Sequence, residues 1–388
     1  MNITQADRLN SVSTYYFAKK LAEIDQMNKI NDIQVINLGI GSPDLPPPPS
    51  VIDTLRSSAL LADVNKYQSY RGIPQLRKAF STWYQRHFNI NIDAEKEILP
   101  LIGSKEGIMH IHMGIINPGD IVLVPDPGYP AYAVTAKLAG ATVLKYNLLK
   151  ENNWLPDFHE LEKMDLKNVK IMWLNYPHMP TGAKANLAFY KKIVAFGLRH
   201  NIIIAHDNPY AFILNDKPIS IFEVKGSKDC CLELVSLSKC YNMSGWRIGA
   251  LIANKQLINV VLKFKSNMDS GMYKPLQLAA IKALEMDQSW TDQLNEKYNK
   301  RRVVARTIMT HLDCQYQENS AGLFVWGKVN TSINNTLQYC DTILQNSKVF
   351  ITPGEVFGKN GKRYIRMSLC NTVQVLNEAL ERIKKMKR

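Results

Sequence analysis

The sequence lacks any long apolar run, although it extends over 388 residues. A helix that spans a membrane needs about 18 or more apolar residues in succession, and no segment approaches that length. The N-terminus alternates charged and apolar residues, whereas a secretory signal carries a continuous apolar core. We therefore expect a cytoplasmic protein that makes no contact with a membrane.

Paired cysteines are also missing. The six cysteines are scattered without C-x-x-C spacing, so neither a disulfide scaffold nor a zinc site is indicated. We expect no bound metal and a reducing compartment.

Acidic residues are fewer than basic ones, and the net charge is +14. The basic residues are spread along the chain, and only the terminal KKMKR is a dense run. A nucleic-acid-binding protein usually gathers such charge on one face or arm, and no helix-turn-helix extension is evident. The charge therefore favours acidic small molecules over nucleic acid as ligands.

Apolar residues make up 46% of the chain, enough for one large core and a smaller one. Between about Leu99 and Asn254, strand-like runs alternate with helical stretches. Strands are expected in the segments DIVLVPDP, ATVLKYNL, VKIMWLNYP, NIIIAHDN, CLELVSLS and RIGALIAN. Runs such as IIIA lack polar alternation, which is typical of parallel strands covered on both faces. This predicts an α/β fold: a large domain with a mostly parallel central sheet flanked by helices.

The segments on either side of this region differ from it. TYYFAKKLAEIDQM near the N-terminus has helical spacing, and the four prolines after LGIGSPDL exclude regular helix or a central strand there. After Asp287, a long charged helix precedes the short strands GLFVWGKV and RYIRMSL and a terminal helix. We predict three parts: an arm that contributes to a small domain (residues 1–46), the large domain (47–286) and a small α+β domain (287–388).

The stretch SLSKCYNMSGWRIG, from Ser236, places Lys239 directly after the predicted strand LELVS. Open α/β sheets bind ligands at the carboxyl ends of their strands, so Lys239 is expected at a ligand site. The hydroxyl groups of Ser236 and Ser238 and the guanidinium of Arg247 suit a phosphate, which leaves Lys239 for another role. Taken alone, a solvated lysine after a strand is the more common interpretation.

Other strand ends carry further polar residues. The strand IIIAHD ends on Asp207, and Tyr210 follows three residues later. In LIGSKEGIMHI, Ser104 and Lys105 precede a helical pattern whose free N–H groups would face a phosphate. Asp207 and Ser104 could each be no more than a helix cap. A lysine, a buried carboxylate, a tyrosine and two phosphate-binding segments are together explained by one cofactor, pyridoxal 5′-phosphate.

The chemistry of this cofactor assigns a role to each residue. Lys239 would form the Schiff base, and partial desolvation would make its amine nucleophilic near neutral pH. Asp207 would keep the pyridine nitrogen protonated so that the ring acts as an electron sink. Tyr210 would donate to the phenolate oxygen of the ring. The phosphate would be held by Ser236, Ser238, Arg247 and the helix start at Ser104.

Longer phrases extend this pattern. NLGIGSPD, GSKEGI, VLVPDPGYPAY, LSKCYNMSGWRIG and KSNMDSG resemble class I/II aminotransferases of fold type I, and are most similar to the LL-diaminopimelate aminotransferase branch. The resemblance covers nearly the whole chain, from about Asn10 to Cys370. It implies a transferase that depends on pyridoxal 5′-phosphate, moves an amino group between an L-amino acid and a 2-oxo acid, and works as a homodimer with shared active sites.

The resemblance also implies residues that meet the substrate and the ring. Arg366 in YIRMSL matches the arginine that grips the substrate α-carboxylate, helped by the backbone of Gly41. Tyr15 and Lys105 match positions that meet the distal end of the substrate. Tyr129 in DPGYPAY matches the aromatic residue stacked on the pyridine ring.

Tyr67 in KYQSYRG matches a tyrosine that reaches the phosphate of the neighbouring subunit.

Two positions depart from the family pattern. The family usually reads N-P-T-G where this chain has MPTG, so Met179 replaces an asparagine that donates to the phenolate oxygen, and a thioether has no N–H to give. Asn175 or His178 could supply the donor instead. Tyr70 stands where some diaminopimelate enzymes have a glutamate.

These residues favour an aminotransferase that acts on diaminopimelate, aspartate or alanine, with 2-oxoglutarate and glutamate as the partner pair. A carbon–sulfur β-lyase on the same fold would share every cofactor residue and differ only after Cα deprotonation. A regulator without enzymatic activity is the third alternative, because Met179 removes one cofactor contact.

Overall fold

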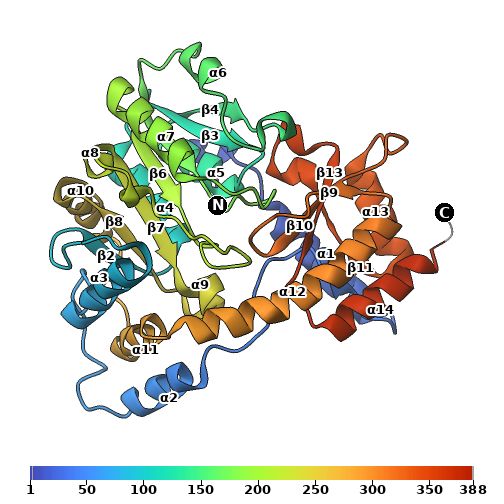
Figure 1. Cartoon of the computed structure of the whole chain (residues 1–388), viewed down its shortest axis with the longest axis horizontal. Coiled ribbons are helices and arrows are strands. Elements are labelled where there is room, and N and C mark those ends of the chain that lie inside the picture. Colours follow the sequence, from blue (N-terminus) through green and yellow to red (C-terminus); the bar gives the residue numbers. More distant parts are fainter. Residues whose placement is uncertain (2, 387–388) are drawn as a thin grey trace.

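The computed structural model describes residues 1 and 3–386, and its main feature is a seven-stranded sheet (Figure 1). In spatial order the strands are β2 (Ile98–Leu101), β8 (Gly249–Ala253), β7 (Cys231–Ser236), β6 (Ile203–Asp207), β5 (Val169–Leu174), β3 (Ile121–Asp126) and β4 (Thr142–Asn147). All neighbours run parallel except at β8, which is antiparallel to both β2 and β7. The six strands expected from the sequence are confirmed, and so is the mostly parallel sheet.

Helices cover both faces of this sheet, which explains why its strands are apolar on both sides. One face packs against α4 (Ser104–Ile115), α5 (Pro130–Leu138) and α10 (Lys255–Lys265). The core on the other face includes side chains of α3 (Pro74–Phe88), α7 (Leu187–His200) and α11 (Lys274–Leu284). The shorter helices of this region are α2 (Pro49–Ser58), α6 (Phe158–Glu162), α8 (Ser227–Cys230) and α9 (Leu237–Cys240).

A second, smaller layer of sheet and helices follows α12 (Gln288–His311), a long helix that runs along both parts of the chain (Figure 1). Its four antiparallel strands are β12 (Thr352–Pro353), β13 (Tyr364–Ser368), β10 (Phe324–Lys328) and β9 (Gln315–Tyr316). The helices α13 (Thr336–Ser347) and α14 (Val373–Lys384) complete this α+β unit. The helix and strand pattern expected after Asp287 is confirmed.

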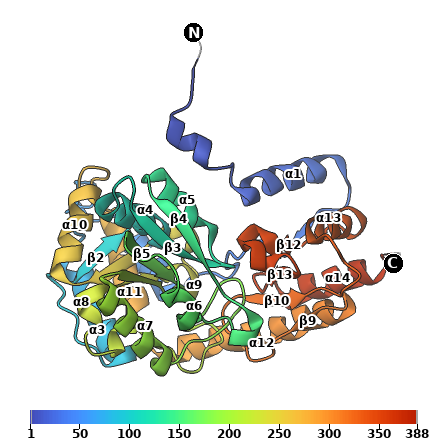
Figure 2. The same cartoon turned by 90° about the horizontal axis from the view of Figure 1, so that it is seen from above.

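The N-terminal segment joins this smaller unit. β1 (Ile36–Asn37) pairs in parallel with β11 (Val349–Phe350), and α1 (Tyr16–Ile30) is tied to α13 by an ion pair of 2.9 Å between Lys20 and Asp341. The 3-10 helix Asp7–Ser11 before α1 lies beside α5, where Lys137 donates to the Ser11 carbonyl oxygen at 3.4 Å, and it projects from the body of the molecule in Figure 2. The N-terminal segment therefore places a strand beside β11 and a helix beside α13.

Local chemistry sets where the elements begin. Side chains cap the first turns of α7, α10, α12, α13 and α14, namely Asn186, Asn254, Asp287, Asn335 and Thr372. The expectation that none of the four prolines lies in regular helix was wrong for the last one. Pro49 begins α2, because the first helical position needs no N–H donor.

Short 3-10 helices lie at Asp7–Ser11, Lys150–Asn152, Ile221–Glu223, Ser244–Trp246, Gly354–Phe357 and Lys359–Gly361. Within the described residues, none of the helices combines the length and apolar character needed to cross a bilayer.

Candidate active site

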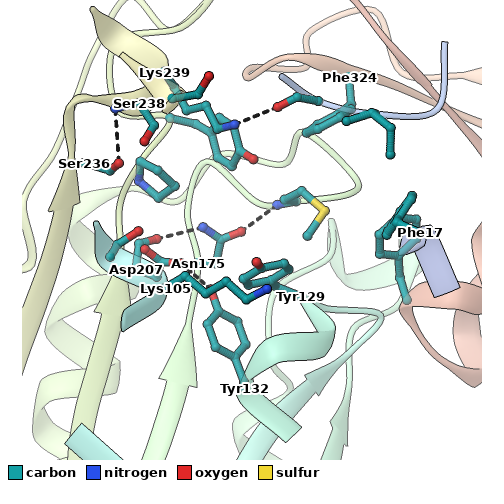
Figure 3. A pocket seen from close by; sticks show the side chains of 18 of the residues that line it. Phe17, Lys105, Tyr129, Tyr132, Asn175, Asp207, Ser236, Ser238, Lys239 and Phe324 are labelled. Atoms are coloured by element: carbon teal, nitrogen blue, oxygen red, sulfur yellow. Dashed lines mark hydrogen bonds between the residues drawn. The ribbon is translucent and has the colours of Figure 1, made fainter. Parts of the chain in front are cut away.

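A cavity of about 480 Å³ lies where the carboxyl ends of β6 and β7 meet the smaller sheet (Figure 3). Its lining contains all the site residues predicted from the sequence except Tyr67. Among the lining residues are four cations, Lys105, Lys239, Arg247 and Arg366, and a single carboxylate, Asp207. The cavity is therefore suited to a ligand with several negative charges.

Lys239 lies on α9, the one-turn helix that follows β7 directly. Its Nζ donates to the Gly41 carbonyl oxygen at 2.6 Å. Burial lowers the pKa of Lys239, and the positive charges of Arg247 and Arg366 lower it further against the opposing effect of Cys370. A lowered pKa leaves more of the amine unprotonated near neutral pH, as a nucleophilic lysine requires.

Asp207 ends β6 and is almost fully buried. Its Oδ2 accepts a hydrogen bond of 2.7 Å from the Tyr132 hydroxyl, and its backbone oxygen accepts one of 2.7 Å from Asn175 Nδ2. The other carboxylate oxygen, Oδ1, has no partner among the described residues. Burial raises the pKa of Asp207 to about 6, against the lowering effects of Tyr132, His206 and Lys239. An unpaired carboxylate oxygen in a cavity is a site for a ligand N–H.

Ser236, Ser238, Arg247 and the start of α4 at Ser104 line the same cavity. Ser236 Oγ accepts from the Ser238 amide at 3.2 Å, which orders the first turn of α9. Arg247 packs directly against the backbone before α4, because a Cβ at Gly103, where φ is +82°, would lie 2.3 Å from Arg247 Nη2. We predicted from the sequence that Ser104 and Lys105 precede the helix. In the structure, both residues lie in the first turn of α4. Free N–H groups at such a turn favour a phosphate.

Arg366, on β13, is buried among aromatic rings. Its guanidinium carbon lies 4.0 Å from the centroid of the Phe324 ring and 4.5 Å from that of Phe357. Nη2 donates to the Gly39 carbonyl at 2.5 Å, and Nη1 lies 3.2 Å from the Met179 sulfur. Nε has no partner among the described residues. Burial lowers the pKa of Arg366 to about 10, so it stays charged at neutral pH and can accept an anionic ligand.

The remaining tyrosines occupy two environments. Tyr129 and Tyr210 line the cavity, and burial raises the pKa of both hydroxyl groups, so both remain neutral donors. Tyr15 lies at the mouth with Lys105 Nζ 4.9 Å from its ring centroid. Tyr67, in contrast, is 91% exposed on the segment between α2 and α3, outside the cavity of its own chain.

The neighbourhood of Met179 decides among the donors that could replace the missing asparagine. Asn175 holds the backbone on two sides: Nδ2 donates to Asp207 and Oδ1 accepts from the Met179 amide at 2.8 Å. His178 is buried and bonds Thr181 at 2.8 Å, and it is not among the residues that line the cavity. Of the two substitutes considered from the sequence, only Asn175 lines the cavity, together with Tyr210.

Comparison with known proteins agrees with this geometry. A family model described as aminotransferase class I and II matches residues 33–383. The chain belongs to this family. It is 38% identical to the LL-diaminopimelate aminotransferase of Aquifex aeolicus, with 98% of this chain and 99% of that relative covered. It is 37% identical to the transaminase BacF of Bacillus subtilis, with 100% and 97% covered. The apo-BacF structure superposes with a TM-score of 0.95 at 35% identity, covering 99% of this chain and 98% of that one.

The cofactor of this aminotransferase is pyridoxal 5′-phosphate, and the residues present fit it. The unpaired Oδ1 of Asp207 suits a protonated ring nitrogen, Lys239 offers a desolvated amine, and the close approach of Arg247 to Gly103 forms an anion cradle. When bound, the cofactor accepts electrons from the substrate Cα and carries the amino group between the two half reactions.

Several residues of the aminotransferase site were not predicted from the sequence. Tyr132 donates to Asp207 (Figure 3). The rings of Phe17, Phe324 and Phe357 surround Arg366. Tyr132 stood inside the quoted segment DPGYPAY, three residues after Tyr129, which was a usable signal. The three phenylalanines carried no such signal in the sequence, because they come from three distant segments of the chain.

Proposed function

We propose that the chain transfers an amino group between an L-amino acid of the diaminopimelate, aspartate or alanine type and a 2-oxo acid such as 2-oxoglutarate. The observation that carries this proposal is the meeting, in one cavity, of a desolvated lysine, a buried carboxylate with an unpaired oxygen and a buried arginine. The first two serve the cofactor, and the third is free for the substrate carboxylate.

Lys239 would act as the base that moves the proton between Cα and the cofactor, because it is the amine of the cavity whose pKa is lowered. Asp207 would hold the ring nitrogen, and Tyr129 would stack on the ring. Tyr210 would donate to the phenolate oxygen. Arg366 would bind the substrate α-carboxylate, helped by the backbone at Gly41.

The phosphate would be bound by Ser236, Ser238, Arg247 and the amide groups at Ser104 and Lys105. These residues belong to the large domain proposed for residues 47–286, whereas Arg366 belongs to the small domain proposed for residues 287–388. A substrate that binds Arg366 would therefore connect the two domains and favour a closed arrangement.

The charges of the cavity support an acidic substrate. Arg247 would neutralise the phosphate, and Arg366 would neutralise the α-carboxylate. Lys239 would bond covalently to the cofactor and would not be available as a cation for the substrate. Lys105 is the remaining cation, and it makes no ion pair with a carboxylate of the described chain. We therefore propose that Lys105, with Tyr15, receives a second, distal carboxylate. Relatives that carry the name LL-diaminopimelate aminotransferase support this class of substrate.

We also propose a cytoplasmic homodimer in which Tyr67 reaches the phosphate in the partner's site. Tyr67 is 91% exposed, and the same segment between α2 and α3 also exposes Leu60, Leu61 and Tyr70. Such a group of exposed apolar residues commonly marks an interface. The cysteines of the chain are all free and buried, which supports a reducing compartment. Sedimentation of the holoenzyme should give twice the mass of the chain, and a monomer would contradict the shared site.

A half-reaction screen tests the proposed function. The holoenzyme is mixed with LL-diaminopimelate, aspartate, alanine or glutamate, and the cofactor absorbance and the 2-oxo acid product are followed. Conversion of the cofactor to its amine form, reversed by 2-oxoglutarate, is expected. Release of pyruvate and ammonia from cystathionine without transfer would instead show a carbon–sulfur β-lyase, and a protein without cofactor absorbance would be a regulator.

A matched pair of variants tests the substrate class. Lys105→Met should lower kcat/KM for dicarboxylic substrates while leaving alanine little changed, because only the former would use the distal cation. Arg366→Lys is the control, since it should affect both groups alike. Equal losses for alanine and for dicarboxylic substrates in Lys105→Met would contradict the distal role.

A further inference from the structure

A fully buried charge pair lies behind the cofactor cavity, on the other face of the sheet. His206 directly precedes Asp207 in β6, and Glu233 is its registered neighbour in β7. Side chains alternate along a strand, so His206 and Asp207 point to opposite faces. His206 Nδ1 lies 2.7 Å from Glu233 Oε2, and both side chains are 0% exposed. None of the roles assigned above uses this pair.

The surroundings of Glu233 stabilise its ionised form. In addition to His206, it accepts hydrogen bonds from the Tyr84 hydroxyl at 2.6 Å, Ser220 Oγ at 2.8 Å and the Ile221 amide at 3.1 Å. Burial alone would raise the pKa of Glu233, but the hydrogen bond and charge of His206, with Tyr84 and Ser220, hold it below its usual value. Its four donors stabilise the buried carboxylate, and a cation beside it would compensate its charge as well.

His206 is the side chain that can supply this cation. Its second ring nitrogen, Nε2, lies 3.1 Å from the Tyr176 carbonyl oxygen and 3.1 Å from the Tyr190 hydroxyl, and the Tyr176 amide points its N–H at the same nitrogen from 3.4 Å. Each ring nitrogen thus has an acceptor within reach, so the imidazole can carry a proton on both nitrogens. Within the described part of the chain, no lysine or arginine bonds Glu233.

Asp207 has few other sources of positive charge. Its neighbours in the cavity are three tyrosines, Tyr132, Tyr129 and Tyr210, and one amine, Lys239. The tyrosines are neutral, and burial lowers the pKa of Lys239, so the lysine contributes less positive charge as the pH rises. When protonated, His206, one residue away and screened from solvent, adds positive charge that lowers the pKa of Asp207.

We propose that His206, held by Glu233, is a positioning residue for the reaction: it fixes the end of β6 and favours the ionised form of the Asp207 carboxylate that pairs with the ring nitrogen of the cofactor. This inference rests on the use of pyridoxal 5′-phosphate described above. It adds a charged pair on the far face of the sheet to the groups that control the cofactor.

The test measures the affinity of the cofactor-free protein for pyridoxamine 5′-phosphate, which cannot bond covalently to Lys239. The dissociation constants of wild type and His206→Asn are compared from about pH 5.5 to about pH 8. If the variant raises the pKa of Asp207 by about 1, its affinity falls about tenfold relative to wild type at the acidic end and equals it at the alkaline end. A loss that is the same at every pH, or no loss at all, would overturn the proposal.

Two further variants guard against a folding defect. Glu233→Gln should change the pH profile in the same direction, because a buried His206 without its anion loses its proton. If Glu233 acted only through its own negative charge on Asp207, the change would have the opposite sign, which would contradict the proposal. Tyr84→Phe removes one neutral donor from Glu233 and keeps the charge pair, so its profile should follow the wild type. Failure of the wild type to bind the probe would overturn the cofactor assignment itself.

Discussion

Asp207→Asn is expected to stabilise the cofactor-free protein above pH 6 while it weakens cofactor binding. Burial raises the pKa of Asp207 from 3.8 to about 6. Between these values the unfolded chain has released the Asp207 proton and the folded chain retains it. Folding stability from this group therefore falls as the pH rises from 3.8 to about 6 and stays low above that range.

The size of the effect follows from the difference in pKa. A difference of about 2 in pKa corresponds to about 3 kcal/mol, which is the upper limit of the gain expected from the asparagine at alkaline pH. At acidic pH, where Asp207 is protonated in both states, the gain should vanish. A buried carboxylate that serves the cofactor thus costs stability when the cofactor is absent.

Urea unfolding of the cofactor-free protein, followed by circular dichroism, measures this difference at about pH 3 and about pH 8. Tyr132→Phe provides the opposite control, because removal of the donor to Oδ2 should destabilise the protein more at the alkaline pH. An Asp207→Asn gain that is equal at both pH values would refute the reasoning, since it would not come from the titration of this carboxylate.

Lys239→Ala should abolish amino transfer while the phosphate cradle still retains some cofactor, measured by turnover and by cofactor content after gel filtration; turnover at the wild-type rate would show that the site is misplaced. Arg366→Lys should lower kcat/KM by a similar factor for every amino-acid substrate, because lysine lacks the planar fork that binds the shared α-carboxylate. A loss confined to dicarboxylic substrates would make Arg366 a reader of the side chain instead. Met179→Asn should lower the pH at which the absorbance of the bound cofactor titrates, because the new N–H would stabilise the phenolate oxygen. An unchanged or raised value would mean that Asn175 or a water already donates there.

The sequence by itself determined the class of fold and the central motif. The apolar runs of the parallel strands lack polar alternation because helices cover both faces, so their pattern can be read without coordinates. Lys239 and Asp207 could be placed at one edge of the sheet for the same reason, since the carboxyl ends of parallel strands share that edge. Ser236, Ser238 and Arg247 lie in the same short stretch as Lys239 and needed no long-range information.

The local sequence did not show which arginine of the segment RYIRMSL lies in the cavity. Arg363 and Arg366 stand in the same short segment, and only the resemblance to the family selected the second. In the structure, Arg363 donates to the carbonyl oxygens of Ile333 and Asn330 at 2.5 and 2.7 Å, whereas Arg366 is enclosed by aromatic rings in the cavity. Burial and partners distinguish the two residues, and both depend on segments that are far away in sequence.

The tertiary structure alone decided which groups control Asp207 and Arg366. Tyr132 reaches Asp207 across 75 positions of sequence, and the Met179 sulfur meets Arg366 across 187. His206 and Glu233 form a buried hydrogen-bonded pair because their two strands are adjacent and in register. Strand order and domain contact bring such partners together, and neither leaves a local pattern in the chain. The sequence determines which chemical groups are present, and the fold determines which of them lose water and must find a partner.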